Sequence, residues 1–323
     1  MKGCASRVAG VALVAMVHAS TALAQAYPAK PIRVIIPFAA GSATDTVGRI
    51  YAQKMGESLG QALVVDNRAG ANGSIGADAV AKAAPDGYTL LVGTNTTNAA
   101  INSLMKNVPF HFERDFAPVS FLGSIPLLVC VSNEFPAKTL KDLVALAKSK
   151  PGTIAFATAS ASQRVSTEML ASMTGIKLVN VPYKSSPNAV TDLMSGQVQL
   201  FTADLAVTLQ QVKAGKIRAL AVTSRQRTAL APDVPTVNEA AGLKDYELIA
   251  WFALFAPAAT PKDVVVKLNE AVRRSAGTAD LKERFTPVGL DVATGSPEEL
   301  AARVKVEAAK WSKAMSEAGI EPE

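Results

Sequence analysis

Short apolar runs alternate with helix-like segments along the first part of the chain. Residues 32–38, 62–66 and 88–92 are largely apolar and bounded by turn residues, which predicts three buried strands. Between them, 44–59 and 74–84 have the apolar spacing and the start signals of helices. This strand–helix–strand–helix–strand order predicts a parallel sheet with right-handed crossovers.

A second alternating set follows. Strands are expected at 126–131, 153–157, 177–181, 198–202, 217–223 and 248–255, and helices at 139–150, 164–173, 187–195, 205–213, 261–275 and 297–318. The run at 126–131 separates the two sets, and the run at 248–255 closes the second one. The simplest arrangement is an α/β domain interrupted by an inserted α/β domain.

This arrangement assigns residues 25–125 and 250–323 to lobe 1 and residues 126–249 to lobe 2. The late helices are expected to pack back on the first half of lobe 1. Two α/β lobes joined by two crossing strands form a central cleft, and ligands bind in such clefts at the carboxyl ends of the strands. A hinge of this kind closes around the ligand.

The first 24 residues have the pattern of an export signal that is cleaved near Ala24. Lys2 and Arg7 precede an apolar, uncharged run at 8–23, which ends in the A-x-A cleavage pattern at 22–24. The alternatives are a membrane anchor and an N-terminal core helix, but the run is short for a span of about 20 residues. The mature protein is therefore expected to be soluble and exported.

Composition and charge exclude several classes of protein. Of the 323 residues, 49% are hydrophobic and 19% charged, which is typical of globular domains and not of disordered, collagen-like or disulfide-scaffold chains. The chain has 33 basic and 27 acidic side chains, a formal net charge of +6. The basic residues form no runs interleaved with aromatics, so we expect no nucleic-acid partner.

The histidine and cysteine content excludes further chemistry. Without the signal, the chain retains His111 and Cys130, too few ligands for a structural zinc site, and we expect no metal and no cofactor. Cys130 lies in an apolar run and is expected to be a buried, inert thiol. His111 lies in a loop between aromatics with no G-x-S-x-G pattern elsewhere, which disfavours a Ser-His-Asp hydrolase. The glycine spacing fits neither dinucleotide-binding nor Walker loops.

Two loops carry the predicted binding chemistry. In the first, 38–45, small residues let the backbone approach a ligand, and the following helix start presents unpaired N–H groups to a carboxylate. Ser42 and Asp45 also have capping-box spacing, and capping alone is an equally supported interpretation. Asp45 is expected to act through water, because two carboxylates repel each other. Boxes interpreted as purely structural begin at Thr139, Thr260 and Ser296. The candidate ligand-binding residues of this loop are Phe38, Ala39, Ala40, Gly41, Ser42 and Asp45.

The second loop, 158–164, lies at the corresponding place in lobe 2. Ser160 and Gln163 again have capping-box spacing, and Arg164 can place two N–H donors on a carboxylate. The alternative for Arg164 is a solvated residue in the first turn of a helix. One anion-suited helix start per lobe either grips a ligand with two anionic ends or clamps one end between the lobes. The candidate residues are Thr158, Ser160, Ala161, Ser162, Gln163 and Arg164.

Three further polar residues follow predicted strands. Thr94 and Asn95 come at the end of the third strand and are expected to bind hydroxyl or amino groups of the ligand. Asp204 follows the strand at 198–202, and it either caps the next helix or faces the cleft, where it binds the same groups.

Motifs in collinear order cover nearly the whole mature chain. They are YPAKPI at 27–32, PFAAG at 37–41 with Asp45 and Arg49, VDNRAGANG at 65–73 with Ile75 and Gly76, PDGYTLL at 85–91, VPYK at 181–184, PDVPT at 232–236 with Glu239, and WF at 251–252. This set resembles the Bug family, the extracytoplasmic solute receptors of tripartite tricarboxylate transporters. The resemblance implies a type II periplasmic-binding-protein fold. It also implies that backbone and water-mediated contacts from the two loops hold a small carboxylate, and it adds Tyr183 to the candidate residues.

The chain departs from the family pattern at the predicted loops. Ser42 stands where the family usually has a second glycine, and Ser185 stands where a glycine usually follows the Tyr-Lys pair. The second loop of the family is usually glycine-rich and leads to a His-Leu pair, whereas this chain has serines before Arg164. Added side chains narrow the access to the backbone, so the ligand is expected to differ from that of better-matched members.

Together these features predict a periplasmic solute-binding receptor, not an enzyme. It captures a small carboxylate, such as a dicarboxylate or tricarboxylate, an amino acid or an aromatic acid, by lobe closure. The expected partners are the membrane permease subunits of a tripartite tricarboxylate transporter, and the expected oligomeric state is a monomer. The alternative is an exported hydrolase or isomerase acting on a small acid in the same cleft. A receptor that signals to a sensor is a third interpretation, which the residues do not separate from the first.

Overall fold

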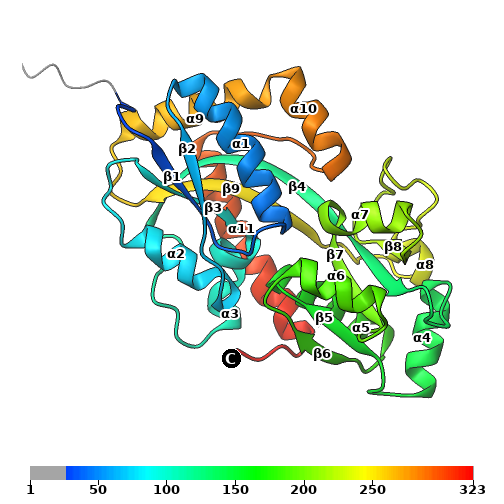
Figure 1. The fold of residues 1–323 in the computed structure, drawn as a ribbon. Coiled ribbons are helices and arrows are strands. Elements are labelled where there is room, and N and C mark those ends of the chain that lie inside the picture. Colours follow the sequence, from blue (N-terminus) through cyan, green and yellow to red (C-terminus); the bar gives the residue numbers. More distant parts are fainter. Residues whose placement is uncertain (1–26, 323) are drawn as a thin grey trace, which may run out of the picture.

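The computed structural model describes residues 27–322, so the predicted export signal lies outside the described residues. The described chain forms two α/β lobes that share one nine-stranded sheet, with lobe 1 at the upper left and lobe 2 at the lower right of Figure 1. The predicted α/β fold of two lobes is confirmed.

The sheet of lobe 1 combines a parallel half with two antiparallel strands. Its strands are β1 (Ile32–Ile36), β2 (Leu63–Asn67), β3 (Thr89–Thr94), β4 (Phe116–Ser132) and β9 (Ile249–Pro257). They lie in the order β2-β1-β3-β9-β4. β1 is parallel to β2 and β3, as the sequence predicted, and β9 is antiparallel to β3 and β4.

The strands of lobe 2 extend the same sheet. They are β5 (Ala155–Thr158), β6 (Val179–Pro182), β7 (Leu200–Asp204) and β8 (Ile217–Val222). β5 is parallel to β6 and β7, and both β7 and β8 pair antiparallel with the second part of β4. Asp204, the last residue of β7, lies opposite Leu127 of β4. The carboxyl end of β7 is therefore directed at the junction of the lobes.

β4 crosses between the lobes and is longer than predicted. It pairs with β9 up to Pro126 and with β7 and β8 from Leu127 on. The sequence predicted a strand only at 126–131, because Pro118 and Gly123 interrupt the apolar run. Register shifts beside both residues let the strand continue through them, as β-bulges do.

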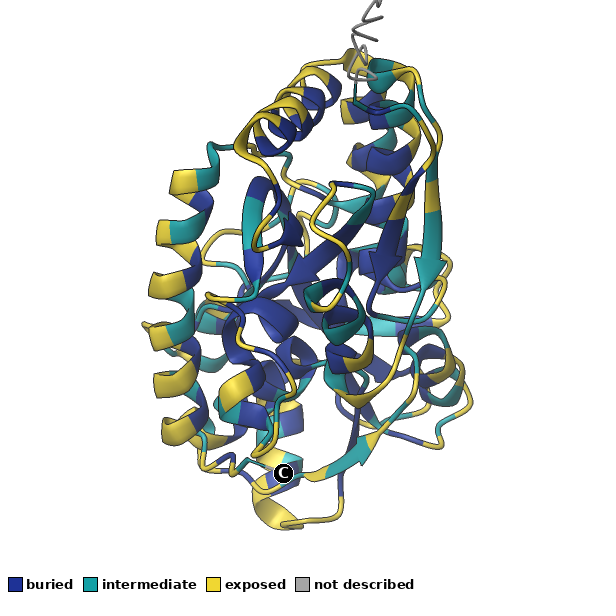
Figure 2. Ribbon diagram, turned by 90° about the vertical axis from the view of Figure 1, so that its left-hand side faces the viewer, coloured by how far each residue is buried: buried dark blue, intermediate teal, exposed yellow. Residues whose placement is uncertain are grey.

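Helices cover both faces of the lobe 1 sheet. They are α1 (Ala43–Leu59), α2 (Ser74–Ala81), α3 (Ile101–Leu104), α9 (Lys262–Ala276), α10 (Ala279–Phe285) and α11 (Pro297–Glu317). α9 and α10 pack on α1, while α9 and α11 contact β4, so the late helices pack back on the first half as expected. Figure 2 shows the buried strands between helices whose outer faces are exposed.

α11 is attached to both lobes. The indole N–H groups of Trp251 in β9 and Trp311 in α11 both donate to Glu307 Oε2, each at 3.1 Å. Further along, α11 contacts α5 (Ala161–Thr174) of lobe 2, and Ser172 Oγ donates to the Glu317 carbonyl at 3.2 Å. This helix therefore links the core of lobe 1 to a helix of lobe 2.

The remaining helices of lobe 2 are α4 (Leu140–Ser149), α6 (Ser186–Met194), α7 (Leu205–Lys213) and α8 (Val237–Ala241). Four short elements were not predicted from the sequence: α3, α8, α10 and a π-helical turn at Thr96–Ala100. Each has only four to seven residues, too few for helical periodicity to show.

Two of the three capping boxes interpreted as structural are confirmed. Thr139 and Ser296 each cap a helix reciprocally with the acidic residue three positions later. The box predicted at Thr260 is wrong. Pro261 occupies the N-cap position of α9, and the Thr260 hydroxyl instead donates to the Pro257 carbonyl at 2.7 Å.

Cys130 is fully buried in β4, and burial raises the pKa of its thiol, as expected of an inert cysteine. His111 is exposed and stacks on the ring of Phe112. Within residues 27–322, no helix combines the length and apolar character needed to cross a bilayer. The same residues contain no group of three His, Cys, Asp or Glu side chains placed to hold a metal ion.

Candidate functional site

A narrow pocket lies between the lobes, at the carboxyl ends of strands from both. Its cavity of about 30 Å³ has room for about two water molecules. Ala250 and Phe252 of β9 contribute to its lining, between the strand ends of the two lobes. The lining residues are Phe38, Ala39, Ser42, Ala43, Thr44, Thr94, Asn95, Thr96, Ala159, Ser160, Ser162, Gln163, Lys184, Ser185, Ser186, Asp204, Ala250 and Phe252.

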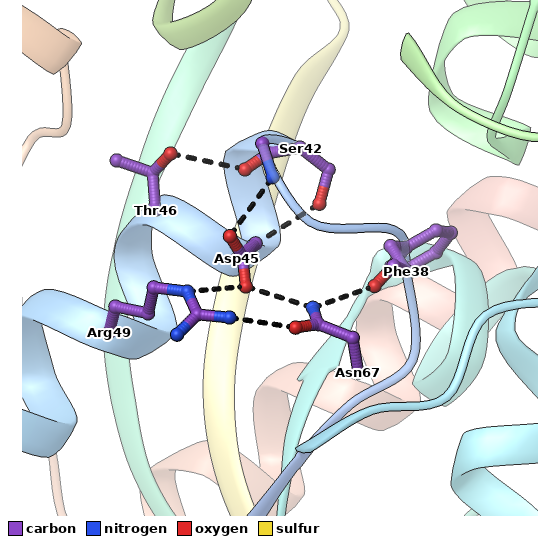
Figure 3. Close-up of polar contacts among 7 residues, drawn as sticks. Phe38, Ser42, Asp45, Thr46, Arg49 and Asn67 are labelled. Atoms are coloured by element: carbon purple, nitrogen blue, oxygen red, sulfur yellow. Dashed lines mark hydrogen bonds and ion pairs between the residues drawn. The ribbon is translucent and has the colours of Figure 1, made fainter. Parts of the chain in front are cut away.

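Asp45 holds the first loop in place. Its carboxylate accepts hydrogen bonds from the Gly41 N–H at 3.0 Å, from Arg49 Nε at 2.9 Å and from Asn67 Nδ2 at 2.8 Å (Figure 3). Burial alone would raise the pKa of Asp45, but these hydrogen bonds and the charge of Arg49 lower it below its ordinary value. Asp45 does not line the pocket. Its observed contacts fix the loop through which α1 begins.

Ser42 caps α1, and its Oγ accepts the N–H of Asp45 at 3.2 Å. The other half of the predicted box differs, because the Asp45 carboxylate reaches the N–H of Gly41 instead of that of Ser42. Ala40 and Gly41 are exposed and do not line the pocket. Gly41 has a φ of +78°, and a Cβ atom there would lie 3.2 Å from Pro187 Cγ of lobe 2. The loop therefore closely approaches the opposite lobe.

The second loop starts α5 without a side-chain cap. The capping box predicted at Ser160 and Gln163 is wrong, because Gln163 Oε1 accepts the N–H of Ala159 at 2.7 Å, one residue before the position that the box requires. The Ser160 hydroxyl lies 3.3 Å from that of Ser162. Gln163 Nε2 donates to Ser186 Oγ at 2.9 Å. The N–H groups in the first turn of α5 are thus left for a ligand or water.

Asp204 faces the pocket and does not cap α7, which separates the two alternatives left open by the sequence. Its side chain is buried, and Gln163 Nε2 lies 3.4 Å from Oδ2. Burial raises the pKa of Asp204 to about 6, although its own backbone N–H and Gln163 oppose the rise. A titratable carboxyl group thus lies in the pocket wall.

A wider cavity of about 550 Å³ adjoins the narrow pocket. Phe38, Ser160 and Lys184 line both spaces. Arg164 and Lys184 give the wider cavity positively charged side chains. The predicted site residues that line only the wider cavity are Thr158, Ala161, Arg164 and Tyr183. The structure therefore divides the predicted second-loop residues between two adjoining spaces.

Several lining residues were not predicted from the sequence. They are Ala43, Thr44, Thr96, Ala159, Lys184, Ser185, Ser186, Ala250 and Phe252. The stretch 184–186 follows β6, and the rule that ligands bind beyond the carboxyl ends of parallel strands would have found it from the predicted strand at 177–181. Ala250 and Phe252 carry no such signal, because apolar residues inside a strand are typical of a core.

Two α/β lobes, two crossing strands and a polar pocket between two helix starts define a two-lobed solute receptor. Residues 47–320 match the family described as the tripartite tricarboxylate transporter family receptor, and the chain belongs to this family. Its members are solute-binding receptors of the periplasmic-binding-protein type, as the resemblance to the Bug family indicated.

Individual proteins similar to the chain agree with this membership. Protein BugT of Bordetella pertussis is 35% identical over 315 residues, which cover 97% of this chain and 96% of BugT. A Rhodopseudomonas palustris protein solved with adipate has 33% identity and a TM-score of 0.89, covering 92% of this chain and 100% of that one. MatC from the same organism, solved with bound malate, has 33% identity and a TM-score of 0.85, covering 89% and 99%.

Proposed function

We propose that this protein is a periplasmic receptor that captures a small carboxylate in the narrow pocket by closing its lobes. One observation carries the proposal: the loops that begin α1 and α5, on opposite lobes, line one pocket. The N–H groups and partial positive charge of a helix start favour a carboxylate. Adipate and malate in the similar structures are both small carboxylates, which supports this choice of ligand class.

The same pocket supports binding without catalysis. Hydroxyl and amide side chains contribute much of its polar lining, while Lys184 and Asp204 are its charged residues. Neither His111 nor Cys130 lines it, so the hydroxyl groups of Ser42 and Ser162 have no histidine base among the lining residues. The lining therefore favours a receptor over a hydrolase or isomerase.

A thermal-shift screen with monocarboxylates, dicarboxylates, tricarboxylates and amino acids tests the ligand class. A ligand at about 100 times its Kd adds about 2.7 kcal/mol to the free energy of unfolding, which raises the melting temperature measurably. We expect stabilisation by at least one acid. Stabilisation by nucleotides or sugars, with none by any acid, would show that the proposed ligand class is wrong.

Serine substitutions test the pocket itself. Ser42→Ala and Ser162→Ala remove hydroxyl groups from the two loops, and each should weaken ligand affinity by about tenfold in isothermal titration, the loss expected for one buried hydrogen bond. Ser149→Ala is the matched control, because Ser149 is exposed in α4 and bonds only within that helix. If the acid is instead consumed in the presence of the wild-type protein, and turnover is lost with Ser162→Ala, the protein is an enzyme.

We further propose that residues 1–24 direct export and are removed. The mature protein purified from the periplasm should begin at Gln25, which intact-mass measurement checks. Recovery of the uncleaved chain in the membrane fraction would contradict this.

The proposed oligomeric state is a monomer, and light scattering should give the mass of a single chain.

We also propose that the receptor delivers its ligand to the permease subunits of a tripartite tricarboxylate transporter. This part of the proposal rests on the family membership. Deletion of the receptor gene should abolish uptake of the radiolabelled ligand identified in the screen. Normal uptake combined with loss of a transcriptional response to the ligand would indicate a receptor that serves a sensor.

A further inference from the structure

Part of the lining of the narrow pocket comes from the ends of strands in opposite lobes. Thr94, the last residue of β3, pairs with Phe252 of β9. Asp204, the last residue of β7, pairs with Leu127 of β4. Because β9 and β4 are neighbours in the sheet, the two strand ends converge on one cavity, which Asn95 also lines.

Asn95 presents unsatisfied polar atoms to this cavity. Its side chain is fully buried, and neither Oδ1 nor Nδ2 has a hydrogen-bond partner among the described residues. The hydroxyl oxygen of the neighbouring Thr96 is also buried and also lacks a hydrogen-bond partner among the described residues. Buried polar groups without partners are unfavourable and rare, so their position on the pocket wall indicates that a polar ligand or water completes them.

Asp204 adds acceptor capacity to the lining of the same pocket. Its side chain is 6% exposed, and its contact with Gln163 Nε2 is long, at 3.4 Å. Gln163 makes a shorter bond to Ser186, at 2.9 Å. An ionised carboxylate has about four acceptor sites, so Asp204 retains acceptor sites that these contacts leave unused.

The lining of the pocket thus contains two sets of groups with opposite hydrogen-bonding character. The starts of α1 and α5, together with Lys184, offer donors and positive charge that suit a ligand carboxylate. Asn95 Oδ1 and the Asp204 carboxylate are acceptors, and Asp204 repels an anion. A hydroxyl or ammonium group on the ligand satisfies these acceptors, whereas a plain hydrocarbon carbon leaves them without donors.

We propose that this receptor selects acids bearing a hydroxyl or amino group on the carbon next to a carboxylate, and that Asp204 and Asn95 recognise that group. The donor must lie close to the carboxylate because the cavity is narrow. This inference rests on the proposed function, since the helix starts must first hold the carboxylate.

Matched ligands test this specificity. Isothermal titration at neutral pH compares succinate, malate and aspartate, then glutarate, 2-hydroxyglutarate and glutamate, then propionate, lactate and alanine. Within every skeleton that binds, a substituted acid should bind at least about tenfold more tightly than the unsubstituted acid, because a site built to bond a donor rejects analogues that lack it. Asp204→Asn should reduce the ratio of the affinity for the substituted acid to that for the unsubstituted acid at least about tenfold. Unsubstituted acids should bind as well as before or better.

Two variants complete the design. Asp233→Asn is the matched control, because Asp233 is an exposed aspartate of lobe 2, and it should leave every ratio unchanged. Asn95→Ala should also reduce the ratio, and it serves as the second test if Asp204→Asn fails to fold in a thermal melt.

The outcomes separate this inference from the proposed function. Unsubstituted acids that bind as tightly as substituted ones, or a ratio unchanged in folded Asp204→Asn and Asn95→Ala, overturn the inference and leave the carboxylate receptor intact. Failure of every acid to bind overturns both.

Discussion

Two buried carboxyl groups near the pocket have pKa values shifted in opposite directions. Burial raises the pKa of Asp204 to about 6. For Asp45, hydrogen bonds from Arg49, Gly41 and Asn67 overcome burial and lower the pKa. The ionised form of Asp204 is therefore unfavourable to the folded state at neutral pH, whereas the ionised form of Asp45 stabilises it.

We expect Asp204→Asn to stabilise the ligand-free protein at neutral pH. The carboxyl group has an ordinary pKa of 3.8 in the unfolded chain and about 6 in the folded one. The folded state therefore binds more protons between these values, and the wild type loses about 3 kcal/mol of stability as the pH rises through this window. Urea unfolding should give the variant a higher free energy of unfolding than the wild type near neutral pH and nearly the same value near pH 4. An equal difference at both pH values would mean that ionisation of Asp204 is not the cause.

Asp45→Asn should have the opposite effect. The ionised carboxylate contributes stability above the ordinary pKa of 3.8, and that stability is lost as the pH falls through the lower pKa of the folded state. We expect the variant to lose about 1–3 kcal/mol at neutral pH, because charge-assisted hydrogen bonds to Gly41, Arg49 and Asn67 are weakened. Urea unfolding measures the loss, and ligand affinity should fall with it because the first loop is released. A stable variant with wild-type affinity would contradict this role.

At the residue scale, most of the residues predicted to bind the ligand line the narrow pocket or the adjoining cavity, whereas their individual contacts were not predicted. The rule of strand ends placed Ser42, Asn95, Ser162 and Asp204 at the narrow pocket. It did not separate them from Arg164, which lines only the adjoining cavity, because that division depends on the direction of each side chain. Side-chain direction after a strand end is set by packing that neighbouring sequence does not show.

At the scale of elements, strands that consist of one nearly continuous apolar run were predicted, whereas β4 was predicted only in part. β1 and β3 are nearly continuous apolar runs between turn residues, a pattern that single-sequence rules recognise. β4 contains Pro118 and Gly123, which those rules treat as breaks. Pairing with β9 across register shifts overrides the local signal, and this long-range pairing is not visible along the chain.

The need for glycine at position 123 of β4 can be tested directly. Its φ is +141°, and a Cβ atom there would lie 2.5 Å from the carbonyl oxygen of Asp291. Gly123→Ala should therefore lower the free energy of unfolding by at least about 2 kcal/mol, through backbone strain and steric overlap. Gly152→Ala is the control, because Gly152 also has a positive φ but no atom lies within 4 Å of the added carbon. This variant should lower the free energy of unfolding by about 1 kcal/mol. Equal losses in the two variants would show that the contact with Asp291 is unimportant.

At the scale of the whole molecule, the narrow pocket and the approach of Gly41 to Pro187 describe lobes close together. β4 and β9 pass the junction near Pro126 and Ile249, where the two residues pair. A ligand larger than about two water molecules does not fit the narrow pocket in this arrangement of the lobes. The two-lobed architecture was predictable from the order of elements, but the degree of closure was not, because it depends on contacts between loops distant in sequence.

We expect the ligand to shift the protein from an open to a closed population. Small-angle X-ray scattering should give a smaller radius of gyration with saturating acid than without it, because closure brings the lobes together. At an acid concentration of about twice the wild-type Kd, Ser162→Ala should stay closer to the ligand-free radius than the wild type does, because its affinity is about tenfold lower. An identical radius with and without a bound acid would contradict capture by lobe closure.

The shared acceptor of Trp251 and Trp311 has a practical consequence. These are the two tryptophans of the chain, and both donate to Glu307 where α11 packs against β9. Intrinsic indole fluorescence of the unlabelled protein therefore reports on one spot, and Glu307→Gln would perturb both emitters together. α11 also contacts α5 of lobe 2, so we expect an acid that changes the distance between the lobes to alter the emission of both indoles. Such a change would allow ligand titrations to be followed without dyes or engineered cysteines.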